Sequence, residues 1–208
     1  SRVAWVVNTF APDIITTKLS GNRFTIAHKK KIMAMSKNAD VVLIGPGIGN
    51  KSGSFIRSLT ASLTKNKKKM VLDADANNAI NINDVDNAII TPHKKEFMMI
   101  LKNSRLKRSN LQKNLKNNVI ILKGPVDEVI SQSTTTHNRH GNSVMTKAGS
   151  GDVLAGLSAG FYAQSNSSWI SACVAAYVNG KTGDYLQKRF GRTFIASDLV
   201  ANIHKIYK

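Results

Sequence analysis

Short β-branched runs alternate with longer amphipathic segments along this chain of 208 residues. Runs rich in Val, Ile and Leu predict strands at residues 3–7, 41–44, 70–72, 88–90 and 119–122, with a further candidate at residues 127–130. The apolar residues have helical spacing at residues 29–36, 54–63 and 95–101. Strands that alternate with helices form largely parallel sheets covered by helices, so the pattern predicts an α/β fold. The length suits a single domain, which we assign to residues 1–208.

The last third of the chain changes in composition. Residues 151–160 and 169–177 are rich in small and apolar residues, which predicts two closely packed helices near the core. A final helix is expected to begin at Ser197, because serine is a favoured N-cap residue. Residues 131–142 are polar instead, and we expect a mobile turn or hairpin there.

The formal charge of +18 favours a polyanionic ligand or partner, such as a dinucleotide, a nucleoside diphosphate or a nucleic acid. The basic runs at residues 28–31 and 67–69 lack interleaved aromatic residues for base stacking, so nucleic acid is not our first expectation. Cys173 is the only cysteine, which excludes an intramolecular disulfide. No apolar run approaches the roughly 20 residues that span a bilayer, and the first residues do not resemble a secretory signal. We therefore expect a soluble cytoplasmic protein.

Segments of Gly, Pro, Asp or His directly follow four of the predicted strands. They are Gly-Pro-Gly-Ile-Gly at residues 45–49, Asp-Ala-Asp-Ala-Asn at 73–77, Thr-Pro-His at 91–93 and Lys-Gly-Pro at 123–125. Because the carboxyl ends of parallel strands meet at one edge of a sheet, we expect these segments to line one crevice. His93 is the strongest histidine candidate for a ligand, with helix capping as the alternative. Lys123 is either a phosphate-facing ammonium or an ordinary lysine at the end of a strand.

The most informative segment is Thr-Lys-Ala-Gly-Ser-Gly-Asp-Val-Leu-Ala-Gly at residues 146–156. Small residues precede an apolar helix there, so backbone N–H groups and the helix dipole can stabilise a phosphate at one spot. Asp152 would stand beside that anion site. A carboxylate in the first turn of a helix is also favourable for structural reasons alone, so both interpretations of Asp152 stay open.

The segment Gly149-Ser150-Gly151-Asp152 resembles the GxGD motif of the ribokinase-like superfamily. Other motifs, in order along the chain, resemble the NAD(P)H-hydrate dehydratase family: residues 45–49, 73–76, 91–93 with Glu96, 122–124, 141–142 and 149–156. The resemblance runs from roughly residue 10 to the end and implies a three-layer αβα fold with a mostly parallel central sheet.

The chain departs from the family pattern at three places. Lysines stand at positions 94–95 where many members have Pro-Gly, and Ser143-Val144 interrupts the usual Gly-Asn-Pro-Gly. The first strand-helix-strand region of the family is missing, so the chain is either a fragment or truly lacks those strands. A sheet that lacks these strands would expose apolar surface and lose part of the substrate pocket.

The resemblance implies dehydration of hydrated NADH and NADPH, driven by ADP or ATP with Mg²⁺ as the nucleotide counterion. By the same resemblance, the hydrated dinucleotide would contact Gly47, His93 and Asp152. The adenine nucleotide would contact Lys123, Gly124, Pro125, Val126, Asp127, Gly149, Ser150 and Gly151. Asp152 would be the catalytic base, and the N–H groups of residues 149–151 would stabilise the developing charge. No dedicated cluster of metal ligands is evident in the sequence.

The resemblance further implies a homo-oligomer, for example a tetramer, and fusion to or pairing with an NAD(P)H-hydrate epimerase. The expected partners are therefore hydrated NADH, hydrated NADPH and an adenine nucleotide, without nucleic acid or membrane. Two other functions stay open. A small-molecule kinase of the same superfamily would share the GxGD motif, and a basic nucleic-acid-binding protein would explain the charge alone.

Overall fold

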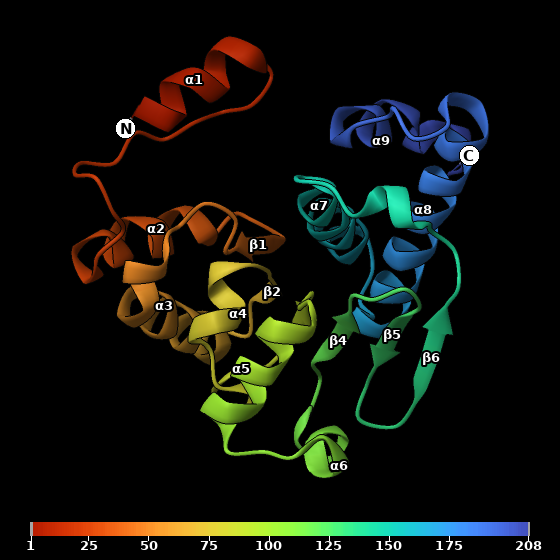
Figure 1. Ribbon diagram of the computed structural model, residues 1–208. Coiled ribbons are helices and arrows are strands. Elements are labelled where there is room, and N and C mark those ends of the chain that lie inside the picture. Colours follow the sequence, from red (N-terminus) through yellow and green to blue (C-terminus); the bar gives the residue numbers. More distant parts are fainter. Residues whose placement is uncertain (1, 208) are drawn as a thin grey trace.

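Six short strands form one sheet in the computed structural model, which describes residues 2–207 (Figure 1). The strand order follows the sequence: β1 (Val41–Ile44), β2 (Lys69–Leu72), β3 (Ala88–Ile90), β4 (Val119–Leu122), β5 (Asp127–Ile130) and β6 (Thr135–Asn138). The first four strands are parallel, and β5 and β6 add to them in antiparallel fashion. The strands predicted from residue 41 onward are confirmed, including the candidate at residues 127–130.

Helices cover both faces of the sheet, which confirms the predicted three-layer αβα arrangement. One layer contains α2 (Lys29–Ser36), α3 (Gly53–Lys65), α4 (Asp75–Ala79) and α5 (Lys94–Ser104), and the other contains α7 (Ser150–Gln164) and α8 (Ser168–Phe190). Side chains alternate along β2, so that Met70 and Leu72 pack in the first layer and Val71 packs against the second. Both faces are buried at β2, β3 and β4, which explains why these parallel strands are almost wholly apolar.

Small residues let α7 and α8 pack closely. Ala155, Ala172 and Ala175 are fully buried in the core on this face of the sheet. The Ser158 hydroxyl, which is also buried, donates a hydrogen bond to the carbonyl oxygen of Leu154 at 2.8 Å. The predicted pair of close helices is confirmed, although both extend beyond the predicted ranges. Over the described residues, no helix is both long and apolar enough to cross a membrane.

The strand predicted at residues 3–7 is wrong, because this segment forms the helix α1 (Arg2–Phe10). A short apolar run does not distinguish a strand from a helix, and Val3, Val6 and Phe10 recur at intervals that place them on one helix face. The helix projects from the rest of the molecule in Figure 1. Val3 is 75% exposed and Phe10 is 85% exposed, so this apolar face is not buried in the core.

Two smaller predictions concern the last part of the chain. The final α-helix, α9 (Ala196–Asn202), begins one residue before the predicted start, Ser197. Ser197 is therefore not its N-cap. Ile195 is the N-cap residue, and the carboxylate of Asp198 in the first turn accepts a hydrogen bond from the Ile195 N–H at 2.7 Å. The polar stretch at residues 131–142 contains the turn and the second strand of the β5–β6 hairpin, so the predicted hairpin is confirmed. A short helix, α6 (Arg108–Leu111), precedes β4.

The turn after β1 depends on a glycine. Gly45 has a φ of 134°, and a Cβ at this position would lie 1.7 Å from the carbonyl oxygen of Asp73. The far end of the loop is fixed as well, since the Gly49 N–H donates to Asp75 Oδ2 at 2.8 Å. The segments that follow β1 and β2 are thereby held against each other.

Gly45→Ala is expected to destabilise the protein by more than the about 1–3 kcal/mol that backbone strain alone costs, because the new methyl group collides with backbone atoms. Gly156→Ala is the matched control. Gly156 lies inside α7 with no heavy atom within 4 Å of its Cβ position, so alanine should stabilise the protein by about 0.5–1 kcal/mol. Urea denaturation measures both changes, and equal stabilities of the two variants would contradict the close approach at Gly45.

Candidate active site

Four chain segments begin at the carboxyl edge of the sheet. Since β1 to β4 are parallel, residues 45–49, 73–77, 91–93 and 123–125 all follow strands at this edge. The last two segments are joined directly, because the Lys123 N–H donates to the carbonyl oxygen of Pro92 at 2.9 Å. The predicted gathering at one edge is confirmed. The predicted single crevice is not, because Ile48 and Gly49 line a separate hollow with residues 20–28.

A cavity of about 680 Å³ opens at the β3 and β4 end of this edge. Seven of the predicted site residues line it: His93, Lys123, Gly124, Pro125, Asp127, Ser150 and Gly151. Its other walls come from the segment between residues 140 and 147, from Leu154 of α7, and from Asn179 and Gly180 of α8. The volume lies in the range of small-molecule sites, roughly 300–1,000 Å³.

Four of the predicted site residues do not line this cavity: Gly47, Val126, Gly149 and Asp152. Gly47 belongs to the loop after β1, and Val126 lines a different hollow beside α5. Asp152 is exposed in the first turn of α7, next to the lining residue Gly151. The cavity therefore brings together six of the eight predicted nucleotide-binding residues and His93.

The glycine-rich turn before α7 leaves two backbone donors for an anion. The Ser150 hydroxyl donates to the carbonyl oxygens of Met145 and Lys147 at 2.6 and 2.8 Å. The backbone N–H of Ser150 also donates to the carbonyl oxygen of Lys147, at 3.3 Å. Ser150 is therefore committed to the turn itself. The N–H groups of Gly151 and Asp152 lie in the first turn of α7, where a helix has no internal acceptors for them. These two groups, at the positive end of the helix dipole, can bind an anion.

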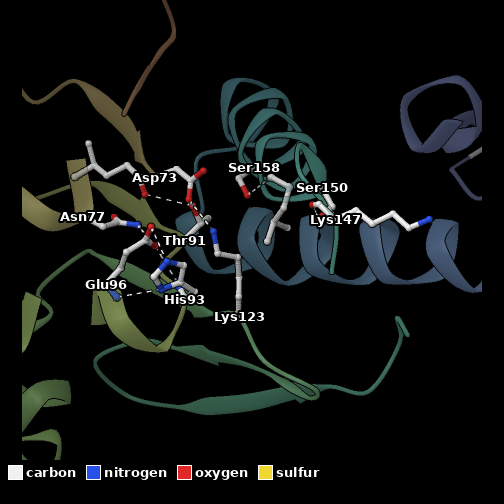
Figure 2. Close-up of polar contacts among 11 residues, drawn as sticks. Asp73, Asn77, Thr91, His93, Glu96, Lys123, Lys147, Ser150 and Ser158 are labelled. Atoms are coloured by element: carbon white, nitrogen blue, oxygen red, sulfur yellow. Dashed lines mark hydrogen bonds and ion pairs between the residues drawn. The ribbon is translucent and has the colours of Figure 1, made fainter. Parts of the chain in front are cut away.

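Lys123 places a positive charge at the same helix end. Its Nζ lies close enough that a Cβ on Gly151 would be 3.4 Å away. The ammonium is held in place by Asp73 Oδ1 at 2.9 Å, and the Thr91 hydroxyl donates to the same oxygen at 2.8 Å (Figure 2). Asp73 is only 2% exposed, so this network is largely buried. The arrangement favours the phosphate-facing interpretation of Lys123.

His93 caps α5 and also lines the cavity. Its Nδ1 accepts a hydrogen bond from the Glu96 N–H at 3.1 Å, and Glu96 Oε2 accepts one from the His93 N–H at 3.0 Å. Asn77 donates to the same Glu96 oxygen at 3.2 Å, so the cluster in Figure 2 links α4 and α5. The imidazole remains 52% exposed. The two predicted roles, helix cap and ligand contact, are therefore compatible.

A carboxylate on α8 fixes the loop that leads to the glycine-rich turn. Asp184 accepts hydrogen bonds from the Gly141 N–H at 3.1 Å and from Asn142 Nδ2 at 3.2 Å. Asn142 Oδ1 accepts one from the Val144 N–H at 3.1 Å, so Asn142 acts as a turn residue. The sequence placed Thr91 at this edge of the sheet but did not indicate its hydrogen bond to Asp73, and it did not indicate Asp184. Both depend on contacts between distant parts of the chain, which no local pattern indicates.

The cavity also contains a carboxyl group with an altered pKa. Burial raises the pKa of Asp127 above its ordinary value of 3.8, and this effect outweighs the hydrogen bonds from Gly124 and Asn138 and the charge of Lys123, which lower it. The Gly124 N–H lies 3.0 Å from Asp127 Oδ1. This hydrogen bond shapes the segment between β4 and β5.

Together, the fold and the site define a ribokinase-like α/β protein with an anion site at a helix N-terminus beside the sheet edge. Residues 3–205 match the NAD(P)H-hydrate dehydratase family, and the chain belongs to that family. It is 34% identical over 202 residues to the bifunctional NAD(P)H-hydrate repair enzyme Nnr of Methanocaldococcus jannaschii, a match that covers 95% of this chain and 39% of that protein. The chain thus spans about two fifths of the length of such relatives.

Two further comparisons concern proteins that are named dehydratases. The chain is 29% identical over 208 residues to the ADP-dependent (S)-NAD(P)H-hydrate dehydratase of Cenarchaeum symbiosum, covering 95% of this chain and 72% of that protein. A crystal structure of the ADP/ATP-dependent NAD(P)H-hydrate dehydratase of Bacillus subtilis superimposes with a TM-score of 0.74 at 19% identity, covering 100% of this chain and 78% of the other. At that identity the likeness establishes the ribokinase-like fold alone.

Asp127→Asn should change the pH dependence of stability. A carboxyl group with a raised pKa in the folded state favours folding most below its unfolded-state pKa, and this contribution is lost as the pH rises through the folded-state value. Compared with the Asn variant, the unaltered chain should therefore lose free energy of unfolding as the pH rises above about 4. Urea titrations at several pH values measure this difference. A relative gain with rising pH would contradict the raised pKa.

Proposed function

We propose that this chain catalyses the ADP- or ATP-dependent dehydration of hydrated NADH and NADPH, which restores NADH and NADPH. The observation that carries the proposal is the convergence of the Lys123 ammonium and the N-terminus of α7 next to Asp152, in a chain of the dehydratase family. The names of its relatives, an ADP-dependent dehydratase and a bifunctional repair enzyme, support the same activity.

We assign the adenine nucleotide to the cavity beside α7. Its phosphates would contact Lys123 Nζ and the N–H group of Gly151, and the segment from Gly124 to Asp127 would contact the rest of the molecule. Gly149 and Ser150 would contribute by shaping the turn rather than by free polar atoms, since the Ser150 hydroxyl and N–H are already bonded. The hydrated dinucleotide would be held by Gly47, His93 and Asp152.

In the proposed reaction, the Asp152 carboxylate takes the proton of the hydroxyl group on the hydrated ring while that oxygen attacks the terminal phosphorus of the nucleotide. ADP or ATP then leaves as AMP or ADP, and the ring carries a phosphate ester. Loss of inorganic phosphate, with loss of a proton from the adjacent ring carbon, restores the dihydropyridine. Lys123 and the N–H groups of α7 stabilise the negative charge of the phosphoryl group during transfer.

Magnesium would accompany the nucleotide. Within residues 2–207, no group of three or more His, Cys, Asp or Glu side chains is arranged to hold a metal ion. Mg²⁺ commonly binds through substrate phosphates, water and only one or two carboxylates, so the donors present are compatible with a nucleotide-borne ion. It would neutralise phosphate charge, and the residues named above would orient the phosphates.

We further propose that residues 1–208 act as one dehydratase domain within a homo-oligomer, and that an NAD(P)H-hydrate epimerase is fused to it or paired with it. The bifunctional name and greater length of the archaeal relatives support the pairing. The exposed apolar side chains of α1, such as Val3 and Phe10, support burial against further polypeptide.

The activity is tested by adding hydrated NADH and ADP to the purified chain and following absorbance at 340 nm. Recovery of the absorbance, together with release of AMP and inorganic phosphate, is expected. A small-molecule kinase would instead transfer phosphate to an alcohol and keep the phosphorylated product. No recovery of absorbance with either ADP or ATP would contradict the proposal.

Asp152→Asn should keep nucleotide binding and lose catalysis, because the amide preserves size but cannot accept the proton. A positioned general base contributes roughly 10²–10⁴ in rate, so turnover should fall by at least about a hundredfold. Asp84→Asn removes an exposed carboxylate before β3, at the opposite edge of the sheet, and should leave turnover unchanged. Near-normal turnover of Asp152→Asn would reduce this residue to a helix-dipole role.

A further inference from the structure

A second hollow, which we call the α5 groove, lies between α5, α6 and the turn after β4 (Figure 1). Its volume of about 850 Å³ is in the range of small-molecule sites. Its apolar lining consists of Phe97, Met98, Leu101, Leu106, Leu122 and Val126. Phe97 and Leu101 belong to the buried core, whereas Met98 is 58% exposed and Val126 is 41% exposed. The groove therefore presents apolar surface that the described part of the chain leaves uncovered.

The charged groups around the α5 groove are almost all positive. They are Lys94, Lys102, Lys107, Arg108, Lys123 and Glu128. Glu128 pairs with Arg108 at 2.5 Å, and Lys123 pairs with Asp73 at 2.9 Å. Within residues 2–207, the other three lysines have no carboxylate at ion-pair distance. An apolar floor with unpaired ammonium groups at its rim complements a ligand that is both apolar and negatively charged.

Two of these lysines stand at opposite ends of α5. Lys102 lies in the last turn, where a positive charge stabilises the helix dipole, so it has a structural role. Lys94 is the first residue of α5, where a positive charge opposes the dipole. A negatively charged ligand group near Lys94 would be attracted by the ammonium and by the positive end of the helix together. The two lysines are about 12 Å apart along the helix, with the apolar residues between them.

We propose that the α5 groove binds a small amphipathic anion, a carboxylate or phosphate carried on an acyl chain. The chain lies along Phe97, Met98 and Leu101, and the anionic group lies at the Lys94 end. A second copy of this protein is a poor occupant, because its formal charge is also +18 and repels the basic rim.

The α5 groove shares a wall with the cavity beside α7. Lys123, Gly124 and Pro125 line both, and Val126 continues the same segment into the groove. A ligand that lies against this segment therefore changes the affinity of the cavity for the adenine nucleotide. By thermodynamic linkage, the nucleotide changes the affinity of the groove by the same factor. This regulatory part rests on the proposed function, whereas binding in the groove does not.

The test titrates the ¹⁵N-labelled chain with octanoate, octyl phosphate, octanol and acetate, and follows the amide signals by NMR. Octanoate and octyl phosphate should shift signals of α5 and of residues 122–126 in a saturable way, and their relative affinities distinguish a fatty acid from a phosphate ester. Octanol lacks the charge and acetate lacks the chain, so each should bind at least about tenfold more weakly. Absence of saturable shifts in the groove, or equal affinities for octanol and octanoate, would overturn the proposal.

Two matched pairs of variants locate the ligand. Met98→Asp should weaken octanoate binding by about tenfold or more, whereas Met35→Asp, at a methionine of α2 that is 50% exposed, should not. Lys94→Gln should weaken octanoate binding and keep or raise the melting temperature. Lys102→Gln should lower the melting temperature and affect binding less. Equal losses of binding within either pair would mean that a basic protein attracts these anions without a site.

The coupling is measured by titrating ADP with and without saturating octanoate. The ADP affinity should change in the unaltered chain and stay constant in Met98→Asp. An ADP affinity that octanoate leaves unchanged would refute the regulatory role. Absence of ADP binding under both conditions would refute the proposed nucleotide site, while the octanoate titration would still decide whether the groove is a site.

Discussion

One buried carboxylate, Asp73, connects the ends of four neighbouring strands. Its Oδ1 accepts from Thr91 after β3 and from Lys123 after β4, and its own carbonyl oxygen packs against Gly45 after β1. Removing a carboxylate and an ammonium from water is costly, and the hydroxyl donor of Thr91 offsets part of that cost. The geometry of the proposed phosphate end of the cavity therefore depends on a side chain that does not itself line it.

This connection has a consequence for the ligand. Lys123 would remain shared between Asp73 and the phosphate, so the ammonium need not move when the nucleotide binds. A donor that is already oriented costs little reorganisation during phosphoryl transfer, which is the physical basis of electrostatic catalysis. The N–H groups of Gly151 and Asp152 are fixed in the same way, because the Ser150 hydroxyl and N–H lock the turn that precedes them.

The sequence predicted the elements that local patterns control and missed those that long-range contacts decide. The strands from residue 41 onward and the gathering of their carboxyl ends follow from apolar runs and parallel topology, and both are confirmed. Residues 3–7 were assigned to a strand because so short a run fits either period. Asp73 was placed at the correct edge, but its pairing with Lys123 joins residues 50 positions apart, and no spacing rule indicates such a pair.

The charge of +18 and the site act at different distances. Exposed charges are screened beyond about 8–10 Å in physiological salt, so the basic surface chiefly raises the rate at which an anion arrives. Once the anion is bound, short-range contacts determine which molecule is retained. One ammonium and two backbone N–H groups hold a phosphate in place, but they do not distinguish one phosphate-containing molecule from another. Discrimination must therefore come from the other groups that line the cavity. Hydrogen-bonding groups that are unsatisfied in the free protein select most strongly, since a wrong ligand leaves them unpaired.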